Sequence, residues 1–136
     1  MARILSIDFG LKRCGIAVTD PLQIIVNGLT TVETKDLETF IQMYCAENPV
    51  EKIIIGYPFQ KDHAENSITP NIILFKQRMA AKLNEMEFQY YDEKKSSVEA
   101  SRILVQAGVR KKQRQDKALI DKMSAVVILQ RYLGHI

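Results

Sequence analysis

The sequence predicts a single domain of the α/β class, in which helices cover a mixed sheet. The first third of the chain holds three strand-like segments in succession, and the rest alternates between strand-like and helix-like segments. Successive strands favour antiparallel pairing, whereas strands separated by helices favour parallel pairing through right-handed crossovers. A chain of 136 residues, with 46% hydrophobic and 26% charged residues, has the size and composition of one globular domain over 1–136.

The first three strands are apolar runs separated by turn residues. Arg3–Phe9 is typical of a buried strand, and Cys14–Thr19 follows a short turn as the second strand of a hairpin. After the turn at Asp20-Pro21 we expect a third strand over Gln23–Val32. The three segments therefore predict the antiparallel part of the sheet.

The middle of the chain alternates between helix and strand. Apolar residues recur at helical spacing over 36–47, and the β-branched run Val50–Ile55 predicts a buried strand. Thr69 is expected to cap the next helix, with Pro70 at its first position. Phe88–Tyr91 then predicts a short strand.

The last third of the chain is expected to be helical. Ser96 and Glu99 have the spacing of a capping box, which predicts a helix ending at Ala107. A basic loop over 110–114 is expected to lead to a last helix at about 116–133. The predicted order is thus β-β-β-α-β-α-β-α-α.

Several features restrict the class of protein. No apolar stretch approaches the ~20 residues of a membrane span, and the first residues lack the organisation of a signal peptide. Cys14 and Cys45 have no metal-ligand spacing, and His63 and His135 are expected at the surface. We therefore expect a cytoplasmic protein with reduced thiols and no membrane contact.

Positive charge is concentrated in one part of the chain. The net charge is only +3, but residues 94–122 hold nine Lys or Arg residues against three acidic ones. Localised basic charge beside carboxylates suits a polyanionic substrate such as nucleic acid. A solvated loop and helix face is the alternative of equal weight.

Acidic residues at three separated points are the candidates for chemistry. Asp8 ends the first strand and precedes Gly10, which permits a sharp turn and the close approach of a phosphate backbone. Asp92 and Glu93 end the Phe88–Tyr91 run, and in a strand adjacent side chains point to opposite faces. Glu93 is the preferred ligand and Asp92 the second choice. The alternatives are a turn aspartate and a solvated pair neutralised by the lysines that follow.

The third candidate is Asp121, which lies about one turn into the helix that Asp116 is expected to cap. Ala125 and Ile128 follow four and seven residues later, so Asp121 can share the buried side of the helix. A buried carboxylate needs a cation or a donor, and a metal ion would supply one. The alternative is a carboxylate favoured by the dipole at the start of a helix.

Four ordered motifs resemble the YqgF (RuvX-like) family of the RNase H-like superfamily over nearly the whole chain. They are the segments 8–17 (DFGLKRCGIA), 53–58 (IIIGYP), 91–100 (YDEKKSSVEA) and 121–129 (DKMSAVVIL). The chain departs from the family pattern at Lys94, where arginine is common, and at Tyr57, where leucine is common. The Asp-Gly often found after the second motif is also absent, and Asp62-His63 stands nearby. These changes affect substrate contacts more than carboxylates, since lysine keeps the charge but lacks the bidentate fork of arginine.

The resemblance implies an RNase H-like fold, with a five-stranded mixed sheet flanked by helices. It implies a nuclease in which Asp8, Glu93 and Asp121 converge on Mg²⁺ or Mn²⁺, with Asp92 as the alternative ligand. Carboxylates suit these ions, which activate water against a phosphodiester. The nucleic acid would be contacted by the basic residues Lys12, Arg13, Lys94, Arg110, Lys111, Lys112 and Arg114.

The resemblance also implies hydrolysis at the 5′ end of the 16S ribosomal RNA precursor, in ribosome biogenesis. Holliday junction resolution on branched DNA is an alternative, and a nucleic-acid-binding module without turnover is another. An actin-like or sugar-kinase-like ATPase needs two such domains, and the chain has room for one. Monomer and homodimer are both open, and symmetric cutting of a junction would favour the dimer.

Overall fold

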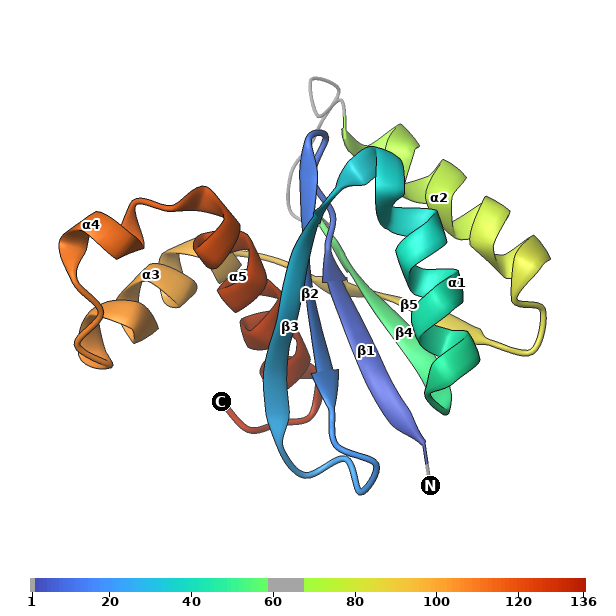
Figure 1. Cartoon of the computed structure of the whole chain (residues 1–136), viewed down its shortest axis with the longest axis horizontal. Coiled ribbons are helices and arrows are strands. Elements are labelled where there is room, and N and C mark those ends of the chain that lie inside the picture. Colours follow the sequence, from blue (N-terminus) through green and yellow to red (C-terminus); the bar gives the residue numbers. More distant parts are fainter. Residues whose placement is uncertain (1, 59–67) are drawn as a thin grey trace.

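The computed structural model describes residues 2–58 and 68–136, which form a five-stranded mixed sheet with helices on both faces (Figure 1). The strands are β1 (Arg3–Asp8), β2 (Arg13–Thr19), β3 (Val26–Glu33), β4 (Val50–Tyr57) and β5 (Glu87–Asp92). The helices are the 3-10 turn η1 (Thr34–Asp36), α1 (Leu37–Glu47), α2 (Ile68–Lys82), α3 (Ser96–Gln106), α4 (Lys111–Arg114) and α5 (Lys117–Tyr132). None of these helices is both long and apolar enough to cross a membrane.

The predicted mixed sheet is confirmed. The strand order is β3-β2-β1-β4-β5, with β1, β2 and β3 antiparallel and with β4 parallel to both β1 and β5. The carboxyl ends of the three parallel strands therefore meet at one edge of the sheet, where ligands of open α/β sheets bind. Asp8, Tyr57 and Asp92 are the last residues of those strands.

The period of two along each strand divides the core into two layers. Leu5 and Ile7 face a large cluster that includes residues of α1 and α2. Ile4 belongs to a smaller cluster with Ala125 and other residues of α5. Figure 1 shows this division, with α1 and α2 on one side of the sheet and α5 on the other. Because Asp8 follows Ile4 by four residues, its side chain lies on the α5 face.

Helix α5 lies unusually close to the sheet because its backbone packs directly on β2. A Cβ atom added at Gly15 would lie 1.8 Å from the carbonyl oxygen of Asp121. Strand side chains hold the same helix on either side of this contact. Ser6 Oγ donates to the carbonyl of Ala125 at 2.7 Å, and Thr31 Oγ1 donates to that of Ala118 at 2.6 Å. These contacts fix where Asp121 stands.

Two element predictions were wrong. Residues 23–25 do not belong to β3, because Asp20 side-chain oxygens accept the N–H groups of Leu22, Ile24 and Ile25 and close a local turn. Gln23 takes a positive φ of 61° within this turn. Residues 110–114 were expected to be a loop, but Lys111–Arg114 form the short helix α4.

The predicted cap of α2 was also wrong. Thr69 is already helical, and Pro70 is the third residue of the helix, after Ile68. Proline is tolerated there because the first N–H groups of a helix have no partner within it. By contrast, Asp116 caps α5 as predicted, accepting the N–H of Ala118 at 3.0 Å. His135 is exposed and both cysteines are free, as expected, whereas His63 and Asp62 lie outside the described residues.

Replacing Gly15 by alanine tests the contact between α5 and the sheet. We expect Gly15→Ala to lower the free energy of unfolding by about 3 kcal/mol or more, because the new methyl group meets helix backbone that can relax only by moving α5. The measurement is urea unfolding followed by circular dichroism.

Gly28→Ala is the matched control for this prediction. For a Cβ atom at Gly28 on the neighbouring strand β3, the three nearest atoms all belong to the flexible side chain of Lys122, the first being Cγ at 2.9 Å. We expect a loss of about 1 kcal/mol or less for this variant. Equal losses in the two variants would contradict the close backbone contact at Gly15.

Candidate active site

Asp8 stands at the end of β1, the central strand of the sheet. Its antiparallel partner is Gly15, which lies under α5, so the carboxylate faces the gap between the sheet and that helix. The turn that follows is tight, since a Cβ atom at Gly10 would lie 2.4 Å from the carbonyl oxygen of Arg13. Thr34 holds this turn, with Oγ1 donating to the carbonyl of Gly10 at 2.7 Å and N–H donating to that of Lys12 at 3.0 Å.

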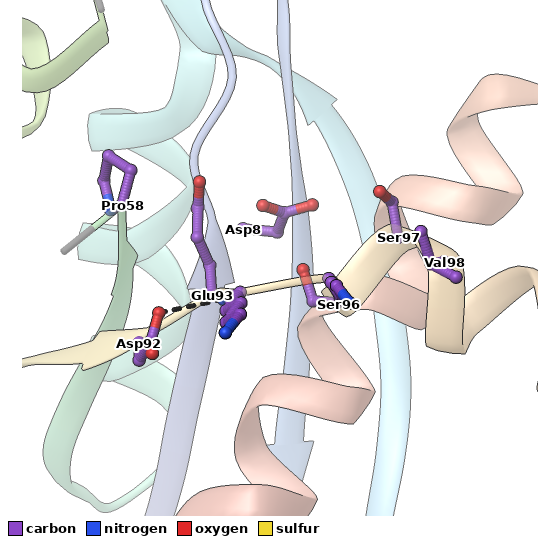
Figure 2. Close-up of a pocket in the computed structure, with 9 residues that line it drawn as sticks. Asp8, Pro58, Asp92, Glu93, Ser96, Ser97 and Val98 are labelled. Atoms are coloured by element: carbon purple, nitrogen blue, oxygen red, sulfur yellow. Dashed lines mark hydrogen bonds between the residues drawn. The ribbon is translucent and has the colours of Figure 1, made fainter. Parts of the chain in front are cut away.

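Glu93 reaches Asp8 from the end of β5. Its N–H donates to the carbonyl of Tyr57 at 3.2 Å, which extends the strand pairing by one residue beyond Asp92. The Glu93 side chain then folds over Gly56 of β4, where an added Cβ atom would lie 3.2 Å from Glu93 Oε1. Figure 2 shows the Glu93 side chain beside Asp8.

Asp92 takes a different role from Glu93. Its Oδ1 atom accepts the N–H of Lys94 at 2.9 Å and so closes the local turn after β5 (Figure 2). The pKa of Asp8 responds to Glu93 and Asp121, whereas Asp92 is not among the groups that shift it. The geometry therefore favours Glu93 over Asp92 as the partner of Asp8.

An open pocket of about 520 Å³ connects these groups. It is lined by Asp8, Pro58 and the consecutive residues 92–98, which run from the end of β5 into the first turn of α3 (Figure 2). The lining changes from carboxylates to the ammonium groups of Lys94 and Lys95 and then to the start of a helix. The pocket thus places negative and positive groups side by side.

The Asp8 carboxyl group is strongly disfavoured in its ionised form. The pKa of Asp8 is raised well above its usual range, chiefly by burial and then by the negative charges of Glu93 and Asp121. Asp8 keeps some surface open to the pocket, but its carboxyl group is closely surrounded by protein. Within residues 2–58 and 68–136, no hydrogen bond or ion pair reaches this carboxyl group.

Asp121 is near Asp8 but its charge is already paired. Arg13 Nε donates to Asp121 Oδ2 at 2.6 Å, and both side chains are largely buried, with exposed fractions of 30% and 26%. Burial raises the pKa of Asp121, and the Arg13 guanidinium offsets part of that rise. Arg13, expected to contact nucleic acid, therefore holds a carboxylate of the candidate site.

The three predicted ligands do not form a ready-made metal cage. Among the residues the structure describes, no three His, Cys, Asp or Glu side chains are grouped so that they could hold an ion together. Asp8 and Glu93 are the adjacent pair, and Asp121 is close enough to shift the pKa of Asp8 while it remains bound to Arg13. The assignment of all three as metal ligands stays a prediction.

The predicted capping box at the start of α3 was wrong. The N-cap is Lys95, in the left-handed region at φ 55°, and no side chain caps the helix. Glu99 pairs with Arg102 instead of returning to Ser96. The box failed because Ser96 N–H already donates to the carbonyl of Glu93 at 3.0 Å, which makes Ser96 the first helical residue.

The predicted basic residues are spread over two regions. Lys94 lines the pocket and Lys12 is exposed in the turn after β1. Arg110, Lys111 and Lys112 are exposed on or beside α4 and do not line the pocket. Arg114 Nε donates to the carbonyl of Val109 at 3.0 Å, so this guanidinium holds its own loop. Contact of these residues with nucleic acid stays a prediction.

Sequence reasoning missed Lys95, Ser96 and Ser97 as pocket residues, and it missed the contact at Gly15. Serines at the start of a helix were interpreted as caps. Whether such a serine caps the helix or lines a pocket depends on which residue is the N-cap, and the sequence did not show this. For Gly15 a signal existed, because glycine inside a strand often marks the close approach of another backbone.

Comparison with known proteins places this chain in a family. The family model RuvX, described as Holliday junction resolvase, matches residues 2–135. The chain belongs to the RuvX family. Proteins of Bacteroides thetaiotaomicron and Phocaeicola vulgatus, each named "Putative pre-16S rRNA nuclease", are 49% and 47% identical over 133 residues, covering 98% of this chain and 96% of each relative. The resemblance drawn from the four motifs is thus confirmed.

Solved structures confirm the RNase H-like fold. The fowlpox virus Holliday junction resolvase superposes with a TM-score of 0.60 at 14% identity, covering 98% of this chain and 99% of that one. RuvC of T. thermophilus, solved with a Holliday junction substrate, superposes with a TM-score of 0.60 at 15% identity, covering 98% and 97%. At such low identity these likenesses establish the shared fold of this RuvX member.

The raised pKa of Asp8 predicts how stability depends on pH. A carboxyl group whose pKa is higher in the folded protein binds more protons there, so its contribution to stability falls as pH rises from about 4 through the raised pKa. In EDTA, we expect Asp8→Asn to be more stable than the wild type at pH 7, with the difference shrinking towards pH 4. Thermal unfolding across this range measures the difference. If the wild type instead became more stable relative to Asp8→Asn as pH rises and Asp8 ionises, the charge of Asp8 would be compensated in the folded protein, contrary to this prediction.

Removing Arg13 tests the ion pair with Asp121. We expect Arg13→Ala to lower the free energy of unfolding by about 1–2 kcal/mol at pH 7, between the effects typical of exposed and buried pairs. The pKa of Asp121 should rise further without the guanidinium, so the loss should shrink on acidification as Asp121 becomes protonated.

Arg102→Ala is the control for the Arg13 prediction, since it removes the exposed pair with Glu99 on α3. We expect a smaller loss at pH 7 than for Arg13→Ala, measured by the same urea unfolding. Losses of the same size would show that Asp121 does not depend on Arg13.

Proposed function

We propose that this RuvX-family chain is a metal-dependent nuclease, which hydrolyses phosphodiester bonds at the 5′ end of the 16S ribosomal RNA precursor in the cytoplasm. The observation that carries the proposal is the state of Asp8. A carboxyl group at the end of the central strand lies beside Glu93 and Asp121, and no donor among the described residues compensates its charge. A divalent cation is the natural counter-charge for such a group.

The residues fit Mg²⁺ or Mn²⁺ in a particular way. Mg²⁺ is commonly held by one or two carboxylates, with waters and substrate phosphates completing its shell. Asp8 and Glu93 would supply the two carboxylates, and Asp121 would join them through water or after release from Arg13.

The chain's own residues would bind and orient the substrate. A divalent ion, when bound, would lower the pKa of the attacking water and place positive charge beside the phosphate. Asp8 is held rigidly by β1, so it fixes the position of that charge at the edge of the sheet. Lys94 and Lys12 are placed to draw a polyanion to this edge, and their contacts would position the backbone without reading bases.

The RNA substrate is supported by the curated relatives, whose name refers to pre-16S rRNA. A four-way DNA junction is the second candidate, favoured by the description of the family model. Both substrates would bring backbone phosphates to the same pocket. A binding module without turnover is the remaining reading, and it would make the carboxylates incidental.

Cleavage assays with carboxylate variants test the function. We expect wild-type protein to cleave RNA that spans the 5′ end of the 16S precursor in Mg²⁺ or Mn²⁺. Asp8→Asn should reduce the rate at least about a hundredfold, because ion-assisted catalysis is worth several kcal/mol. Asp92→Asn is the matched control and should retain activity within about threefold, since Asp92 closes a turn.

The outcomes separate the candidate functions. Asp8→Asn protein that cleaves as fast as the wild type would refute the assigned chemistry. Cleavage of a four-way DNA junction, without cleavage of the RNA, would favour the resolvase. Salt-sensitive binding of both, with no product in any divalent ion, would favour the binding module.

A further inference from the structure

We propose that the first turn of α3, residues 95–98, is a binding site for one internal phosphate of the nucleic-acid backbone beside the carboxylates. The site consists of the Ser96 hydroxyl, the N–H groups of Ser97 and Val98, and the Lys95 ammonium group. It adds a phosphate site to the proposed function and rests on nucleic-acid binding alone, without requiring hydrolysis.

The first turn of α3 has backbone N–H groups that are available to a ligand. Lys95 is the N-cap, and its side chain does not cap the helix. Among the described residues, no acceptor is bonded to the N–H of Ser97 or of Val98, as is usual in the first turn of a helix, and the preceding carbonyl of Lys94 accepts from Arg131 Nη1. Ser97 and Val98 both line the pocket. A helix start with free N–H groups attracts an anion through hydrogen bonds and through the helix dipole.

A buried hydroxyl points to a ligand independently of the helix. Ser96 is only 6% exposed, yet its Oγ atom has no hydrogen-bond partner in the part of the chain that is described. The residue lines the pocket, and Figure 2 shows its hydroxyl directed to the same space as the Asp8 carboxyl group. This hydroxyl keeps its accessible surface in the pocket, so a phosphate oxygen bound there would accept its hydrogen bond.

Charge explains why the expected ligand is a phosphate of a polymer. Asp8 and Glu93 in the same pocket repel a free anion, whereas a backbone phosphate is held in place by the rest of the nucleic acid. Lys94 and Lys95 add two positive charges on the side where the pocket meets α3. The left-handed backbone of Lys95 orients the first turn, and at φ 55° that conformation is uncommon outside glycine, asparagine and aspartate.

The test measures binding without cleavage and without metal. Asp8→Asn protein in EDTA is titrated with a fluorescent RNA hairpin in which one phosphate at a time is replaced by a neutral methylphosphonate. Ser96→Ala, made in this protein, should weaken binding of the unmodified hairpin by roughly tenfold, as expected for loss of a hydrogen bond to a charged group. Ser101→Ala, on the same helix but outside the pocket, is the matched control and should change binding by less than about twofold.

The decisive result is coupling to a single position. For a hairpin with the methylphosphonate at one particular internal position, Ser96→Ala should leave the Kd almost unchanged. For hairpins modified at the other positions, Ser96→Ala should still raise the Kd roughly tenfold. A loss that is the same at every position, or no loss, would overturn the proposal. Coupling to the terminal phosphate only would overturn the assignment to an internal phosphate.

Lys95→Gly is a second variant that keeps the left-handed backbone without its side chain. It should couple to the same methylphosphonate and should reduce the slope of log Kd against log salt by about one. An unchanged slope and no coupling would overturn the proposal even if Ser96→Ala failed to fold. A hairpin that does not bind wild-type protein at low salt would instead refute the proposed function.

Discussion

The close packing of α5 on β2 is the constraint on which the candidate site depends. At Gly15 the helix backbone occupies the space that a side chain would take, so α5 lies closer to the sheet than side-chain packing allows. Ser6 and Thr31 hold the helix by hydrogen bonds to its carbonyls on either side of that point. Because these hydrogen bonds go to backbone atoms, they fix both the position of the helix along its axis and its distance from the sheet. The position of Asp121 near Asp8 is therefore set by the packing of the α5 backbone on the sheet.

The same packing explains why the site is costly to the folded protein. Asp8 is closely surrounded by protein, and Glu93 and Asp121 add like charge to it. Asp121 is bonded to the guanidinium of Arg13, which offsets part of its own charge. A fold selected for stability alone would neutralise or remove such a carboxylate. The presence of this unfavourable carboxylate at the edge of the sheet therefore indicates a function that requires a cation.

Much of this arrangement was predictable from sequence, because it follows from strand periodicity. The order of strands and helices predicted the mixed sheet, and the period of two predicted that Glu93 and Asp92 face opposite ways. The start of α3 was not predictable from local spacing. Ser96 and Glu99 have the spacing of a capping box, but the extension of β5 pairing to Glu93 moves the first helical turn by one residue. Likewise, the hydrogen bonds of the Asp20 side chain hold residues 24 and 25 in a turn, so β3 begins later than the apolar sequence indicated.

The segment from Asp92 to Val98 also explains how opposite charges come to lie side by side in one pocket. Within seven residues the chain passes from carboxylates at a strand end, through two lysines, to the open start of a helix. The distance between the cation-favouring and anion-favouring parts is therefore set by local backbone geometry, whereas Asp8 and Asp121 are placed by the packing of distant elements. A phosphate bound at the helix start would lie beside the carboxylates at a fixed separation. Substrate and cation would then each reduce the repulsion that the other meets, so the proposed site would be complete only when both are present.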